Sequence, residues 1–138
     1  MNYSQVDPAE VATNLRRGRA EEAVRDAYGK ELEVKRLGKA KDEGIDGAAA
    51  GLVAAQEALT EATAVLKRCL RRAPLDDKTI RSLQREYLSK WLGSLESEHA
   101  KYETLLADAE EDGDSEAAKG YVRALAVLAS AHEMALEE

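Results

Sequence analysis

The sequence is poor in several residue types, and each scarcity narrows what the chain can be. It has no phenylalanine, one tryptophan and only 4% aromatic residues. Alanine supplies much of the 44% hydrophobic content, so we expect a thin core made by closely packed helices rather than by large side chains. Cys69 is the only cysteine, which excludes an intrachain disulfide and a thiolate metal cluster within one chain.

Long hydrophobic runs are also lacking. The longest apolar run, AAAGLVAA from Ala48, is too short to span a bilayer. The amino-terminal stretch MNYSQVDPAE has neither the basic region nor the apolar region of a secretory signal. We therefore expect a soluble protein with no membrane association and a cytoplasmic, or at least intracellular, location, and membership of a virion or another assembly stays open.

Charge is plentiful but unbalanced. Acidic residues number 27 against 20 basic ones, and the net charge is −7. This balance disfavours non-specific binding to nucleic-acid phosphates. A charged fraction of 34% is typical of amphipathic helices with solvated outer faces.

Helix-start and helix-stop signals divide the chain into helical segments. Asp7, Pro8 and Glu10 form a strong helix start, and Gly18 is expected to interrupt the helix that follows. Pro74 ends another helix, and Gly113 breaks the acidic stretch EEDGDSE. Strand-like alternation is absent. The predicted helices are 8–17, 19–42, 48–72, 77–111 and a last one that begins at Asp114 or Ser115.

Short connections make consecutive helices antiparallel neighbours. Around Gly113 this register places Leu95 near Ala131, a large residue against a small one, and around Pro74 it places Leu66 near Ser82. The predicted fold is an all-α antiparallel helical bundle of about four long helices plus a short N-terminal helix. Residues 1–138 are predicted to form one domain, in which 1–42 could be a semi-independent helical arm.

One motif resembles a metal half-site. Glu96 and His99 have the Glu-x-x-His spacing that di-iron bundles use. The motif occurs once, because Ala129 stands three residues before His132, so a site would need a symmetric partner or a further ligand such as Glu57 or Glu61. The preferred interpretation is a histidine in a helix-packing seam. No metal, cofactor or catalytic residue is predicted, and the chain is not expected to be an enzyme.

Two basic clusters suggest a nucleic-acid surface, because clustered Lys and Arg release counterions from phosphates. Cations near a helix C-terminus are also explained by the helix dipole, so this interpretation is an alternative. The candidate residues are Arg16, Arg17, Arg19, Lys67, Arg68, Arg71 and Arg72.

The preferred hypothesis is an interaction role. The first half of helix 77–111 is apolar over a wide arc and contains aromatic types that are common at interface hot spots. Its candidate interface residues are Tyr87, Trp91, Leu92 and Leu95. Whether this arc is core or interface stays open. The chain is interpreted as a non-catalytic adaptor or structural component of a larger assembly, such as a viral or phage assembly, with a protein partner or its own copies. A nucleic-acid-associated regulator and a metal-binding bundle are the alternatives.

Overall fold

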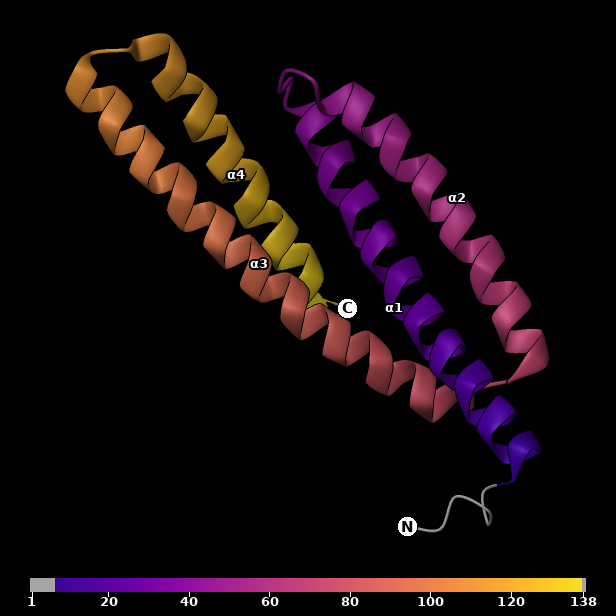
Figure 1. Cartoon of the computed structure of the whole chain (residues 1–138). Coiled ribbons are helices and arrows are strands. Elements are labelled where there is room, and N and C mark those ends of the chain that lie inside the picture. Colours follow the sequence, from indigo (N-terminus) through magenta and orange to yellow (C-terminus); the bar gives the residue numbers. More distant parts are fainter. Residues whose placement is uncertain (1–6, 138) are drawn as a thin grey trace.

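A computed structural model describes residues 7–137, so residues 1–6 and 138 of the predicted domain lie outside the described range. The chain forms four helices, α1 (Pro8–Asp42), α2 (Ala48–Arg72), α3 (Asp77–Asp112) and α4 (Ser115–Glu137) (Figure 1). No strand occurs between residues 7 and 137, and the all-α prediction is confirmed. No helix in this range is long and apolar enough to cross a membrane.

The helix ends follow local capping chemistry. The Asp7 carboxylate accepts a hydrogen bond from the Ala9 N–H at 2.9 Å, and Asp76 accepts one from the Thr79 N–H at 2.8 Å. These bonds satisfy N–H groups that have no partner inside the helix. At the other end of α3, Gly113 adopts a φ of 74°, a left-handed conformation that glycine reaches without a steric penalty. The boundaries predicted for α2 and α3 therefore agree with the structure to within one residue.

The expected break at Gly18 does not occur. α1 runs without interruption from Pro8 to Asp42, so the separate short N-terminal helix was a wrong prediction. A glycine inside a helix costs only about 1 kcal/mol relative to alanine. With strong capping at Asp7 and regular helix on both sides, that cost is too small to end the helix. α1 contacts each of the other three helices.

The four helices form two hairpins, and α1 lies between α2 on one side and the α3–α4 pair on the other (Figure 1). α2 lies along α1 and has no such backbone contact with α3 or α4; only at its first residue, Ala48, does it reach a side chain of α4, that of Val127. The expected register between Leu66 and Ser82 is therefore wrong. The connection through Ala73 and Pro74 crosses α1 (Figure 1), and α3 packs on a different face of that helix.

The core is thin and spread along the helix seams. One cluster joins Leu95, Leu128 and Ala131 between α3 and α4, which confirms the predicted pairing of Leu95 with Ala131. A second cluster joins Ala40, Ala48 and Val127 where α1, α2 and α4 meet. More than half of the buried hydrophobic residues are alanines. The full set of buried hydrophobic residues is Ala20, Ala23, Val24, Tyr28, Leu32, Ala40, Ala48, Ala55, Ala73, Leu83, Leu95, Ala109, Val127, Leu128, Ala131 and Ala135.

Candidate functional site

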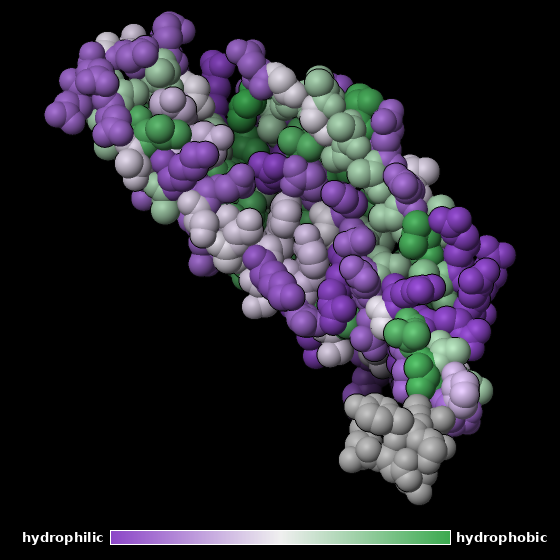
Figure 2. Space-filling model, viewed as in Figure 1, coloured by the Kyte–Doolittle hydropathy of each residue, from purple (hydrophilic) through white to green (hydrophobic). Residues whose placement is uncertain are grey.

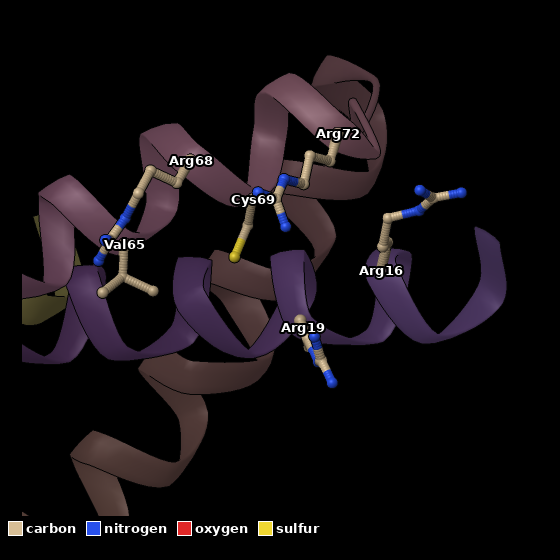
Figure 3. A pocket seen from close by; sticks show the side chains of 6 residues that line it. All are labelled: Arg16, Arg19, Val65, Arg68, Cys69 and Arg72. Carbon is tan, nitrogen blue, oxygen red and sulfur yellow. The ribbon is translucent and has the colours of Figure 1, made fainter. Parts of the chain in front are cut away.

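The first hairpin brings the two predicted basic clusters together. Because α1 and α2 are antiparallel, the beginning of α1 lies beside the end of α2, and a pocket of about 270 Å³ opens between them. We call this pocket the arginine groove (Figure 3). It is lined by Arg16, Arg19, Val65, Arg68, Cys69 and Arg72.

The guanidinium groups are distributed around this groove and do not meet at one point. Figure 3 shows Arg72 reaching from α2 toward α1 beside Cys69, whereas Arg68 lies toward Val65. Arg16 rises from α1, and Arg19 points away from α2. Val65 and Cys69 are half-buried and form an apolar floor. The arrangement suits several spaced negative charges better than one small ion.

None of the four lining arginines has a hydrogen bond or ion pair to another residue in the described part of the chain. Two arginines further along α1, Arg25 and Arg36, are paired. The Arg25 Nη2 lies 2.9 Å from Glu86 Oε2, and Arg36 Nη1 lies 3.7 Å from Glu98 Oε2. The groove therefore contains positive charge that the described chain does not neutralise.

Three of the predicted basic residues, Arg17, Lys67 and Arg71, do not line the groove. Each is exposed and lies next in sequence to a lining arginine or one residue away from it. They add to the positive potential around the groove, since solvated charges act over distances of about 10 Å at moderate salt.

The histidines are arranged differently from a metal half-site. Glu96 does not pair with His99 one turn away; its Oε1 lies 3.4 Å from His132 Nε2 on the opposite helix. His99 Nδ1 instead lies 2.9 Å from Glu103 Oε1. Both imidazoles are about one-third exposed and line one open pocket of about 510 Å³ between α3 and α4.

Each histidine is thus held by a carboxylate at the edge of the packing seam. Among residues 7–137, no three His, Cys, Asp or Glu side chains are grouped closely enough to hold a metal ion. Glu57 and Glu61, the candidate further ligands, lie on α2, which does not contact α3. The two parts of the proposed half-site therefore do not come together within one chain.

The predicted interface residues lie in contacts within the chain. Leu95 is 2% exposed, and Trp91 packs against the Leu95 cluster between α3 and α4. Tyr87 packs on α1, where its ring meets Tyr28 edge-on with 6.1 Å between centroids. Leu92 is half-buried. The wide apolar arc of α3 is occupied at these positions by α4 and α1.

The crossing of α1 and α3 depends on a glycine. A Cβ atom at Gly29 would lie 2.2 Å from the Tyr87 hydroxyl oxygen and 2.4 Å from its Cζ, so only glycine allows the ring to approach this closely. Burial raises the pKa of Tyr87, and the charge of Asp26 acts in the same direction. Beside it, the hydrogen bond from Arg25 lowers the pKa of Glu86.

A further surface was missed by sequence reasoning. In the first two turns of α2, residues 48–55, every side chain is apolar or absent. α1 covers only the side that includes Ala48 and Ala55, and Val53 on the outer side is 55% exposed. We call the exposed set the α2 outer face: Ala49, Ala50, Val53 and Ala54. The sequence signal for this face is the run AAAGLVAA, which is too short to span a bilayer but has no polar side chain.

Comparison of the chain with protein-family models, curated proteins and solved structures gives no match.

The structure brings only some of the predicted site residues together. It joins the two arginine clusters in one groove and pairs Glu96 with His132, which was not expected. It places Tyr87, Trp91 and Leu95 in intrachain packing. The first hairpin has two surfaces that could bind a partner: the arginine groove, which is positively charged, and the α2 outer face, which is apolar and exposed.

Proposed function

We propose that the chain is a non-catalytic component of a larger protein assembly and binds another protein through the α2 outer face. The observation that carries this proposal is that the first two turns of α2 are entirely apolar in composition but only partly buried. A helix that is apolar on all sides is normally buried, yet residues 48–55 are covered by α1 on one side only. In Figure 2 green and pale green, hydrophobic side chains gather over the first part of α2, whereas purple, hydrophilic ones dominate toward its end.

The accessible area of the whole chain supports the same proposal. The chain exposes 9318 Å², whereas a compact monomer of its mass exposes about 7,000 Å². The seven residues outside the described range could account for at most about 1,200 Å² of the difference. The remaining excess exceeds the roughly 800 Å² that one partner buries in a standard protein–protein interface.

The small side chains of the α2 outer face favour a helical partner. Alanine lets two helix backbones approach closely, and a single larger residue, Val53, provides a knob for packing. Because residues 48–55 extend over about 12 Å of helix, the face suits two to three turns of a partner helix. A second copy of this chain offers such a helix in α2 itself.

The test is the solution mass of the chain and of an Ala50→Gln/Val53→Gln variant, measured by light scattering over a range of concentrations. At about 0.5 M salt, where exposed charges are screened, the wild-type mass should rise above 15.0 kDa, and the variant should remain closer to the monomer. Both substituted positions are exposed, so the circular dichroism spectrum should not change.

A matched control is Thr60→Gln/Ala64→Gln, which adds the same side chains to exposed positions further along α2. This control should associate like the wild type. A wild-type chain that stays monodisperse at 15.0 kDa at high concentration would contradict binding of a second copy through this face.

A second candidate function is association with nucleic acid, and the arginine groove favours it. Arginines that are about 50 residues apart in the sequence lie together there, and the four that line the groove have no hydrogen bond or ion pair to another residue within 7–137. The experiment is binding of a labelled oligonucleotide over a series of salt concentrations, because phosphate contacts make affinity fall steeply with salt. Absence of binding at low salt would exclude this function.

A further inference from the structure

We propose that the arginine groove binds the acidic turn between α3 and α4 of a second copy, so that copies of the chain join head to tail. The acidic turn is residues 110–116, with the sequence EEDGDSE. The inference rests on the proposed function in treating the chain as a component of an assembly, but it uses a different surface and a different force.

The two surfaces lie at opposite ends of one elongated molecule. Figure 1 shows the start of α1 and the end of α2 together at one end, and the α3–α4 turn at the other. The turn therefore cannot reach the groove of its own chain. It can reach the groove of another copy.

The acidic turn, like the groove, has unneutralised charge. All its residues are exposed, and Glu110, Glu111, Asp112 and Glu116 form no ion pair with another described residue. Asp114 accepts a hydrogen bond from the Ala117 N–H at 3.2 Å, which fixes the geometry of the turn. A tight turn thus presents several carboxylates within a short distance.

The positive zone of the groove is also short. The basic cluster of α2 covers residues 67–72, which is about 9 Å along the helix axis. Acidic residues limit it on both helices, with Glu10 and Glu21 on α1 and Glu61 on α2. A long polyanion that followed these helices would meet those carboxylates, whereas a compact acidic turn would not.

The floor and rim of the groove fit glutamate side chains. The methylene groups of glutamate can pack on Val65 and Cys69, and the carboxylates can then meet guanidinium groups around the rim. Since the groove and the turn are different surfaces, the contact is heterologous. Such contacts generate open chains or closed rings rather than two-fold dimers.

The experiment uses sedimentation velocity in the Ala50→Gln/Val53→Gln background, in which the α2 outer face is blocked. Association should be clear at about 0.02 M salt and should disappear at about 0.5 M, because screening shortens the range of exposed charges. Adding Arg68→Gln and Arg72→Gln should weaken association about tenfold. The control, Arg81→Gln/Arg85→Gln, removes the same charge from exposed positions on α3 and should have no such effect.

A mixing experiment tests the polarity of the contact. A Glu110→Gln/Glu111→Gln variant retains its groove, and an Arg68→Gln/Arg72→Gln variant retains its acidic turn. Both variants are made in the Ala50→Gln/Val53→Gln background, where each alone should remain monomeric. Together they should form a complex of one copy of each and nothing larger, because only one intact groove and one intact turn are present.

The head-to-tail contact would be overturned if association did not depend on salt. It would also be overturned if the Arg68→Gln/Arg72→Gln variant associated as strongly as its control. Neither result would bear on the proposed binding through the α2 outer face. Loss of association in the Ala50→Gln/Val53→Gln background at low salt would likewise overturn the head-to-tail contact. A labelled oligonucleotide that binds the wild type, loses binding in Arg68→Gln/Arg72→Gln, and displaces no second copy would assign the groove to nucleic acid instead.

Discussion

Replacement of Gly29 by alanine tests the α1–α3 crossing most directly. Gly29 is buried, and an added methyl group would lie 2.2 Å from the Tyr87 hydroxyl oxygen, well inside van der Waals contact. The Tyr87 ring would have to move out of its place on α1 and lose its edge-on contact with Tyr28. The Tyr87 side chain rotates about two bonds only, so its hydroxyl group cannot move away from the methyl group unless the whole ring moves.

Two opposing effects set the magnitude. Overpacking of this kind costs about 1–3 kcal/mol, while alanine in place of glycine within a helix contributes about 1 kcal/mol of stabilisation. The net expectation for Gly29→Ala is a destabilisation of about 1 kcal/mol. In a Tyr87→Ala background the methyl group has room, so the same substitution should instead stabilise the protein by about 1 kcal/mol. The sign should reverse.

Urea denaturation followed by circular dichroism measures the free energy of unfolding for the wild type, both single variants and the double variant. Gly18→Ala is the matched control on the same helix, since no atom lies within 4 Å of its added Cβ, and it should stabilise the protein by about 1 kcal/mol. If Gly29→Ala stabilises the wild type as much as Gly18→Ala does, the close contact with Tyr87 is absent and the crossing is wrong.

Three other substitutions test separate features. Leu95→Ala should lower the free energy of unfolding, measured by urea denaturation, by about 2–5 kcal/mol because Leu95 is 2% exposed. Leu136 is 62% exposed, so Leu136→Ala should change that free energy by no more than about 0.5 kcal/mol. Equal losses for the two variants would contradict the packing of Leu95 between α3 and α4. Arg25 lowers the pKa of Glu86 below its ordinary 4.5, so the charged carboxylate stabilises the fold above that pH, and the stabilisation is lost as pH falls through the lowered pKa. Glu86→Gln should therefore flatten the dependence of thermal midpoint on pH below about 4.5, and an unchanged profile would mean that the ion pair does not contribute. Gly113→Ala should lower the thermal midpoint, because φ is 74° there, while Gly120→Ala, with open space around it, should raise it; the same direction for both would contradict the left-handed cap.

The sequence was sufficient to predict the helices because their ends depend on local chemistry. Asp76 and Gly113 act through hydrogen bonds and backbone conformation a few residues away, and the register of α3 against α4 follows from one tight turn. Gly18 was overinterpreted, because a glycine weakens a helix without ending it. The basic clusters at residues 16–19 and 67–72 were identified individually, but their meeting in one groove required the antiparallel pairing of α1 with α2.

The path from α2 to α3 could not be predicted from connection length, yet the sequence contained two signs of it. The register expected for a direct α2–α3 pairing placed Leu66 against Ser82, and Ser82 is exposed in the structure, so that face of α3 offered nothing apolar to bury. The side of α3 that carries Tyr87 had a better partner in Gly29 and Tyr28 of α1. Burying an aromatic ring against a glycine contributes more than pairing leucine with serine, and α3 therefore packs on α1. As a consequence, beyond the contact of Ala48 with Val127, α2 is covered by α1 alone. The exposed Val53 lies on this helix, and the arginine groove lies between it and α1.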